Sequence, residues 1–265
     1  MVNLDYKNLY IIEKYKYPFP IIIYSGLLTE TQLDLLQNSI SDKATIFDKK
    51  YMGNRKTILK GTKNFNSFLK KNQITNLINK FFEDKKVFNF FYNNLNQINQ
   101  NEKKKFELKN KKFKFLSNYI NRDSKFKFKL KNKINKISSL YKNDHRIYCD
   151  FDFSVAGPGY AREPHRDRDE RVLVFLYYIN NFNNDKGGNL QIFEYKNAPN
   201  EYLQQPDVND LTIFHNLHTK RGNLITFMST PDSIHGVDEI MKSEEKRYFF
   251  YGSYSSINKV EWEIC

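Results

Sequence analysis

From His145 onward the chain consists of short apolar runs separated by turn residues, and no other feature of the sequence limits the fold as strongly. GPG, NNFNNDKGG, KRG and TPDS separate several of the runs, and no long stretch with helical spacing intervenes. Closely spaced strands without helices between them indicate an antiparallel sandwich or barrel. The predicted strands are RIYCDFDFSV, RVLVFLYYI, NLQIFEY, LTIF, NLITFM and KRYFFYGSYS.

The first third of the chain is predicted to mix a strand with helices. A strand over residues 21–24 and a turn at Ser25-Gly26 precede a helix that Thr29 can cap, with Gln32 reaching back. The segment 74–98 is predicted as a second amphipathic helix, more loosely patterned. The first helix places three apolar side chains on one face: Leu33, Leu36 and Ile40.

Most of the formal net charge of +13 comes from one contiguous segment. Residues 101–142 hold fourteen Lys and one Arg against three acidic residues, a local net charge of +12. Such a run indicates either a solvated insertion, which we favour, or contact with nucleic acid or a membrane surface. Within it, KFKFKLK alternates strictly and predicts a half-buried edge strand with Phe126, Phe128 and Leu130 on one face.

The cysteine count and the N-terminus indicate an intracellular setting. Cys149 and Cys265 lie far apart, so neither a disulfide framework nor a CxxC metal site is expected. The first residues, MVNLDYKNLYIIEKYK, carry scattered charges rather than the apolar core of a signal peptide. The longest early apolar stretch is far shorter than the roughly 20 residues that span a bilayer. We therefore expect a soluble, cytoplasmic protein without a membrane span.

A histidine and an aspartate lie two residues apart where one predicted strand begins. On extended backbone, His165 and Asp167 project to the same side and can hold a metal together. His235 follows the strand NLITFM and a turn, which in a sandwich returns it to the same end. Two His and one carboxylate leave coordination positions open and suit non-haem Fe(II), although zinc accepts the same ligands. His215 and His218, in a predicted loop, are weaker alternatives, and His145 is interpreted as solvated or structural.

Arg247 lies on the last long strand, twelve residues after His235. A buried Arg offers two parallel hydrogen bonds to a carboxylate, which fits the distal end of a dicarboxylate whose other end chelates a metal. Lys246 is adjacent, but neighbouring residues of a strand point to opposite faces, so only one of the two can lie inside. We favour Arg247.

Together these segments resemble the Fe(II)- and 2-oxoglutarate-dependent oxygenases, and within them the prolyl-4-hydroxylase-like branch. The matching pieces are GPGYAREPHRD, RVLVFLYYIN, GGNLQIF, GNLITF, SIHGV and KRYFFYGSY, in the family's order over residues 153–254. The resemblance implies an α+β, mainly β protein: a double-stranded β-helix (jelly-roll, cupin-like) core with N-terminal supporting helices. Residues 1–142 would form the support region, which carries the Lys-rich insertion at 101–142, and residues 143–265 the catalytic core. The length of the chain predicts that both belong to one globular unit.

The resemblance also implies a site and a reaction. His165, Asp167 and His235 match the iron ligands, and Arg247 matches the anchor for 2-oxoglutarate. The implied reaction couples decarboxylation of 2-oxoglutarate, to succinate and CO2, with hydroxylation of a substrate by O2. Ascorbate is a further candidate cofactor. The substrate is expected to be peptidyl proline, a sugar, a lipid or a small metabolite, and the oligomeric state is left open.

Two positions depart from the family pattern. Phe249 stands where many relatives carry Ser or Thr as a second contact to the cosubstrate carboxylate. The tyrosine that often precedes the HxD motif is not clearly matched: Ala156 and Arg162 occupy the nearest equivalent positions, with Tyr160 between them. Tyr178, on the next strand and in phase with Val174 and Leu176, is the proposed substitute.

Charged residues are interleaved around the predicted ligands, and they allow two interpretations. The arginines suit an anionic substrate, while Glu163, Asp169 and Glu170 suit a self-neutralised rim; Arg171 can support the first ligands by pairing with an acid. Two other functions are compatible with the sequence: nucleic-acid binding or modification through the Lys-rich segment, and a catalytically silent jelly-roll that binds a metal or ligand for structure. The arginines of this stretch are Arg162, Arg166, Arg168 and Arg171.

Overall fold

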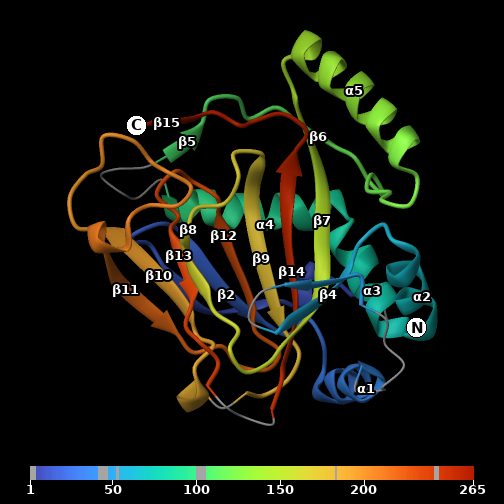
Figure 1. Ribbon diagram of the computed structural model, residues 1–265. Helices are drawn as coiled ribbons and strands as arrows, with labels where there is room; N and C mark the ends of the chain where they lie inside the picture. The colour runs from blue at the N-terminus through green and yellow to red at the C-terminus, as the bar shows by residue number, and fades with distance from the viewer. Residues whose placement is uncertain (1–3, 41–46, 52–53, 100–105, 183, 242–244) are drawn as a thin grey trace.

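The computed structural model describes residues 4–40, 47–51, 54–99, 106–182, 184–241 and 245–265, and two antiparallel sheets form its centre (Figure 1). Eight consecutive strands form the smaller sheet and the middle of the larger sheet, and they bear out the sandwich predicted from the apolar runs. The strands are β7 (His145–Ala156), β8 (Arg162–His165), β9 (Arg171–Tyr178), β10 (Leu190–Tyr195), β11 (Leu211–Leu217), β12 (Leu224–Met228), β13 (His235–Val237) and β14 (Arg247–Ser256).

The order of these strands is that of a jelly-roll. The larger sheet runs β1-β2-β12-β9-β14-β7-β4-β3, and the smaller sheet runs β11-β10-β13-β8. From β7 to β14 the chain crosses repeatedly between the two sheets, which confirms the double-stranded β-helix. N-terminal strands extend the larger sheet at both edges: β1 (Tyr10–Tyr15), β2 (Ile21–Ser25), β3 (Lys49–Tyr51) and β4 (Arg55–Leu59).

Strand β9 shows why its apolar run is continuous rather than alternating. Val174 and Leu176 belong to the core between the two sheets. Leu173 and Phe175 belong to the core between the larger sheet and the helices behind it. Because both faces are covered, every position from Val172 onward is buried.

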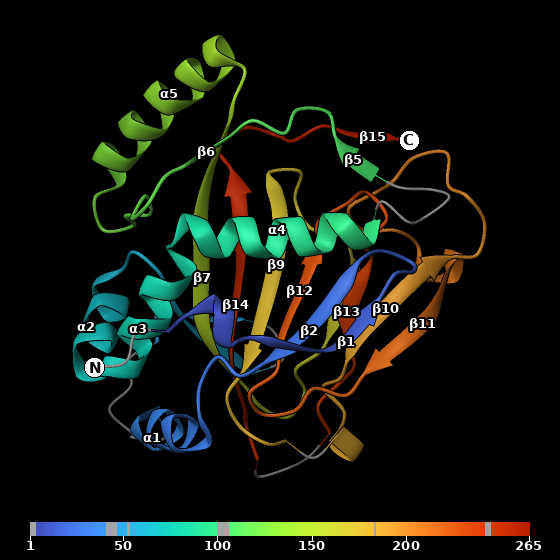
Figure 2. The same cartoon turned by 180° about the vertical axis from the view of Figure 1, so that it is seen from behind.

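Helices α1 to α4 lie within residues 30–99, and in Figure 2 α4 crosses the back of the larger sheet. The predicted capping box is present, since Gln32 N donates to Thr29 Oγ1 and Thr29 N donates to the Gln32 side chain. The predicted inward residues of the first helix are buried. The helices are α1 (Glu30–Ile40), α2 (Lys63–Lys71), α3 (Gln73–Phe82) and α4 (Lys85–Asn99), and a 3-10 turn over Tyr6–Asn8 precedes β1.

The prediction of one helix over 74–98 is wrong, because the segment is divided between α3 and α4. Glu83 ends α3, and its buried carboxylate pairs with the Lys60 ammonium instead of facing solvent. Asp84 Oδ1 accepts a hydrogen bond from Lys86 N at 2.8 Å and so caps the next helix. Two polar residues therefore stop one helix and start another within a continuous apolar pattern.

The predicted strand over KFKFKLK is also wrong, because these residues begin helix α5 (Lys125–Lys142). The strict alternation covers only seven residues, whereas Ile134 and Ile137 continue with helical spacing. Asn143 ends the helix in the left-handed region, with φ of 47°. The preceding residues form β5 (Phe106–Leu108) and β6 (Phe113–Phe115), and β5 pairs with β15 (Trp262–Ile264).

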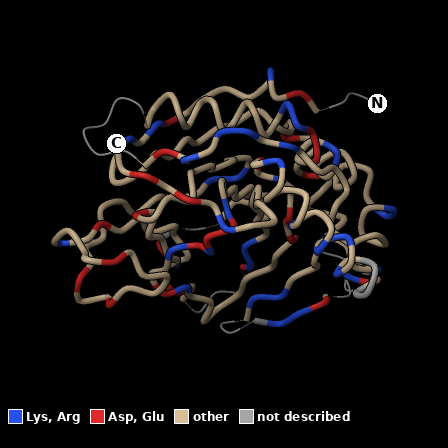
Figure 3. The backbone as a smooth tube through the Cα atoms, turned by 90° about the horizontal axis from the view of Figure 1, so that it is seen from above, with Lys and Arg blue, Asp and Glu red and all other residues tan. Residues whose placement is uncertain are grey.

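Lys and Arg, and Asp and Glu, are both scattered over the backbone trace (Figure 3). Cys149 is buried, Cys265 is exposed, and both thiols are free, as expected. Within the described ranges, no helix has the length and apolar character required to cross a bilayer. Two short 3-10 turns lie in loops of the jelly-roll, at Asn184–Lys186 and Val208–Asp210.

Candidate metal centre and cosubstrate pocket

The three predicted metal ligands meet where the smaller sheet pairs β8 with β13. His165 ends β8, His235 begins β13, and the two are direct partners in the antiparallel register. Asp167 follows His165 by two residues, and one ligand atom from each of the three lies within 4.8 Å of the others. The structure thus brings together residues that are separated by as many as 70 positions in the chain.

Backbone carbonyl groups orient both imidazoles. His165 Nδ1 lies 2.9 Å from Glu163 O, and His235 Nδ1 lies 3.0 Å from Ser233 O. A proton on each Nδ1 leaves the Nε2 lone pair for a metal. Burial lowers the pKa of His165 to about 3 and also lowers the pKa of His235, so both rings are neutral at physiological pH.

Asp167 is buried and has one carboxylate oxygen without a hydrogen-bond partner. Its Oδ1 accepts from the Arg171 guanidinium and, at 3.2 Å, from Tyr251 Oη. Its Oδ2 has no hydrogen-bond partner among the described residues and lies 3.7 Å from His235 Nε2. Burial opposes ionisation, but the Arg171 guanidinium and the hydrogen bond from Tyr251 hold the pKa of Asp167 below its ordinary value. An ionised, buried oxygen facing two imidazole nitrogens fits a divalent cation such as Fe(II).

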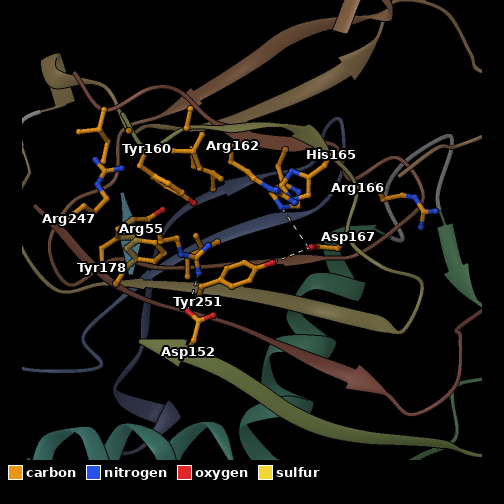
Figure 4. A pocket seen from close by; sticks show the side chains of 18 of the residues that line it. Arg55, Asp152, Tyr160, Arg162, His165, Arg166, Asp167, Tyr178, Arg247 and Tyr251 are labelled. Atoms are coloured by element: carbon orange, nitrogen blue, oxygen red, sulfur yellow. Dashed lines mark hydrogen bonds and ion pairs between the residues drawn. The ribbon is translucent and has the colours of Figure 1, made fainter. Parts of the chain in front are cut away.

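A cavity of about 460 Å³ connects this centre with Arg247. In Figure 4, Arg247 and the metal-ligand residues lie at opposite ends of the group, with aromatic side chains between them. The cavity therefore has a cationic group at one end and a metal-ligand set at the other. Other residues that line it are Tyr160, Leu176, Tyr178, Gly188, Leu190, Val237, Ile240, Phe249 and Tyr251.

Arg247 is buried and lacks a full set of acceptors. Among the described residues, its Nε and Nη2 have no hydrogen-bond partner. Burial lowers the pKa of Arg247, because a charged guanidinium loses hydration free energy inside the protein. Hydrogen bonds to an incoming carboxylate would offset this loss. Gly188 provides the space, since a Cβ at this residue, whose φ is +73°, would lie 3.1 Å from Arg247 Nη1.

Tyr178 and Phe249 both line the cavity beside Arg247. The Arg247 guanidinium lies 5.5 Å from the Tyr178 ring centroid, and the Tyr178 and Phe249 rings are 6.0 Å apart. Tyr160, which lies between the two positions nearest the family's tyrosine, lines the same cavity, as does Arg162, whereas Ala156 does not. Burial raises the pKa of Tyr178 to about 12, so its hydroxyl stays protonated. Of these three aromatic residues, Tyr178 is the one that the sequence predicted as a cosubstrate contact.

Sequence reasoning missed Arg55 and Tyr251. Arg55, from β4, donates to Asp152 Oδ1 at 3.0 Å and to Ser154 Oγ, and its guanidinium lies 5.4 Å from the Tyr251 ring centroid. Tyr251 has the same strand parity as Arg247, so alternation along β14 was a usable signal. Nothing in the segment RKTIL indicated that Arg55 reaches the site.

The interleaved charges are sorted by the fold. Arg166 pairs with Asp169 at 2.7 Å, and Arg171 pairs with Asp167. Arg162 and Arg168 line the cavity without a carboxylate partner among the described residues. The three rim acids of the sequence, Glu163, Asp169 and Glu170, are not part of the lining.

The other histidines lie outside the ligand cluster. His215 is in strand β11, not in the predicted loop, and its ring centroid lies 4.5 Å from that of Tyr15, with the two rings tilted. His218 Nδ1 lies 3.1 Å from Asn189 Oδ1. His145 begins β7, where its ring contacts Phe113. Among the described residues, the group of three is the one cluster with metal-ligand geometry.

Comparison with known proteins gives one family match. Residues 151–254 match the model described as "2OG-Fe(II) oxygenase superfamily". This region contains the metal-ligand cluster, Arg247 and the four aromatic residues of the pocket. The aromatic residues are Tyr160, Tyr178, Phe249 and Tyr251. No curated protein matches the chain.

Solved structures to which the chain is similar include two prolyl 4-hydroxylases. The Pseudomonas putida enzyme is 12% identical with a TM-score of 0.42, over 89% of this chain and 91% of that one. The Phytophthora capsici enzyme is 12% identical with a TM-score of 0.49, over 89% of this chain and 58% of that one. A Burkholderia pseudomallei oxidoreductase of the 2OG-Fe(II) oxygenase family is 11% identical with a TM-score of 0.30, over 44% and 48%.

Proposed function

We propose that this chain, whose residues 151–254 belong to the 2OG-Fe(II) oxygenase superfamily, hydroxylates a substrate at the open end of its jelly-roll. Fe(II), 2-oxoglutarate and O2 are the cofactor and cosubstrates of this superfamily. The observation that carries the proposal is the combination, in one cavity, of a His-Asp-His cluster with a buried, under-bonded Arg247. Each end of the cavity accepts one end of 2-oxoglutarate.

In this proposal the chain's own residues bind and orient the reactants. When bound, Fe(II) and 2-oxoglutarate use O2 to yield succinate, CO2 and a hydroxyl group on the substrate. His165, Asp167 and His235 would hold the metal, and Arg171 keeps Asp167 ionised and oriented. Arg247, beside Tyr178, would bind the distal carboxylate through paired hydrogen bonds.

The mouth of the cavity supports a substrate with an anionic group. Arg162 and Arg168 are exposed there and have no carboxylate partner in the part of the chain that the structure describes. Gln204 and Gln205 line the same cavity. Two unpaired guanidinium groups favour carboxylate or phosphate over a cationic group. We expect an anionic group on the substrate whichever of the suggested substrate classes it belongs to, peptidyl proline included.

Charge-matched peptides test this part of the proposal. Two peptides with a central proline, flanked by Glu in one and by Lys in the other, are compared for succinate formation above the rate without peptide. The Glu peptide should stimulate more, and the double variant Arg162→Glu/Arg168→Glu should reverse the preference. Equal stimulation of the wild type by both peptides would remove the anionic-substrate argument and leave the oxygenase assignment standing.

The oxygenase assignment itself is tested by product formation. With Fe(II), 2-oxoglutarate and O2, the wild-type protein should release succinate even without a substrate, at a slow uncoupled rate. His235→Ala should abolish the release, because one of three metal ligands is lost. His215→Ala is the matched control, since His215 lies outside the cluster, and should keep the wild-type rate. Succinate formation that persists in His235→Ala would contradict the proposal.

A further inference from the structure

Helix α5 carries an apolar stripe that faces solvent. Leu130, Ile134, Ile137 and Tyr141 are each more than half exposed, and Tyr141 is 94% exposed. Their spacing of four, three and four residues places them on one side of the helix. In Figures 1 and 2 the helix stands at an outer corner of the molecule, beside the end of β7. The stripe is therefore accessible along the helix.

The opposite side of α5 is polar, and it is the side attached to the rest of the protein. Arg146 donates to Asn135 Oδ1 and to Ser138 Oγ, both at 2.6 Å. Tyr119 Oη donates to Asn132 Oδ1 at 2.8 Å. These bonds fix the rotation of the helix about its own axis, so the outward direction of the apolar stripe is built into the fold.

Lysines border the stripe, and the helix contains no acidic residue. At 100° per residue, Lys129, Lys133 and Lys136 follow one edge of the stripe and Lys131 follows the other. Long lysine stems can lie along an apolar surface while the ammonium groups reach outward. An apolar stripe with basic borders is the pattern of helices that lie in the plane of a membrane interface.

We infer that α5 binds an anionic membrane surface, with the stripe in the interfacial layer and the lysines on the lipid headgroups. Nucleic acid would use the lysines but leave the apolar stripe in water. A second copy of α5 packed on the stripe would bring the lysine borders of both helices together, and like charges repel. An anionic lipid surface accommodates both features at once.

Vesicle sedimentation with the full chain tests the inference. Vesicles of phosphatidylcholine and phosphatidylserine in equal amounts should bind the wild-type protein, and vesicles of phosphatidylcholine alone should bind it much less. Ile134→Asp/Ile137→Asp should weaken binding to the mixed vesicles about tenfold or more. Ile213→Asp is the matched control, because Ile213 is a similarly exposed isoleucine on β11, and should bind as the wild type does.

A second pair of variants tests the charge. Lys129→Glu/Lys133→Glu should also lose binding, whereas Lys70→Glu/Lys71→Glu, on the exposed side of α2, should retain it. Circular dichroism confirms folding, and Ile134→Ser/Ile137→Ser replaces the Asp variant if that one unfolds. Equal vesicle binding by wild type and stripe variants overturns the inference. The inference is also overturned if the wild type does not bind vesicles but forms a dimer that the stripe variants dissociate. It is likewise overturned if the wild type does not bind vesicles but binds duplex DNA, and the stripe variants keep that DNA binding.

Discussion

Helices α4 and α5 each have an apolar face and a polar face, but their apolar side chains point in opposite directions relative to the protein. In α4, Val87, Phe88, Phe91 and Leu95 face the larger sheet and are buried. In α5, the apolar stripe faces solvent and the polar side faces the protein. The contrast shows that an amphipathic pattern states which face is apolar, while the position of the helix in the fold decides what that face can meet.

Removing a core ring from α4 should have the largest effect on stability. Phe91 is fully buried, and its ring lies 5.4 Å from that of Tyr24. Phe91→Ala leaves a cavity that the surrounding rings cannot fill, so the free energy of unfolding should fall by about 3–5 kcal/mol. Urea denaturation followed by circular dichroism measures it. A loss below about 1 kcal/mol would mean that α4 is not packed as described.

Detaching the polar side of α5 should have an intermediate effect. Arg146→Met keeps most of the side-chain stem but removes the hydrogen bonds to Asn135 and Ser138. Bonds from a charged donor contribute about 1.5–3 kcal/mol, and the loss should be concentrated in α5. Limited digestion by trypsin should therefore cut within 125–142 faster than in the wild type. An unchanged cleavage rate there would show that other contacts hold the helix.

Changing the exposed stripe should have the smallest effect on stability. Ile137→Asp adds a charge where the side chain already faces water, so the free energy of unfolding should stay within about 0.5 kcal/mol of the wild type. Leu95→Asp in α4 is the contrasting variant, because it buries a charge in the core. The same urea titration compares the two. Similar losses for both would erase the distinction between the helices.

The jelly-roll strands could be predicted because burial constrains them on one or both faces. The run from Val172 to Tyr178 is apolar throughout since it lies between two cores. The metal-ligand set followed from local spacing together with the expected return of His235 to the same end of a sandwich. The α5 helix was missed because alternation over seven residues fits a strand as well as an exposed helix. Only the three-dimensional structure distinguishes these two possibilities.

The pocket was less predictable than the ligands. Tyr251 could have been found, because it alternates in phase with Arg247 and Phe249 on one strand. Arg55 could not, since it reaches the cavity only through the pairing of β4 with β7, about a hundred residues away in the sequence. Long-range pairing of this kind leaves no local signal. The roles of Arg247 and Tyr178 toward 2-oxoglutarate stay predictions.

The most direct test of the central claim is an anaerobic titration of the protein with Fe(II) and 2-oxoglutarate, followed by the visible charge-transfer absorption of the chelate. The wild type should develop the band and His235→Ala should not. Arg247→Met should raise the 2-oxoglutarate concentration at half-saturation by about tenfold to a hundredfold. Lys246→Met, at the exposed neighbouring position, should titrate like the wild type. A wild type without the band, or equal losses in the Arg247 and Lys246 variants, would contradict the account.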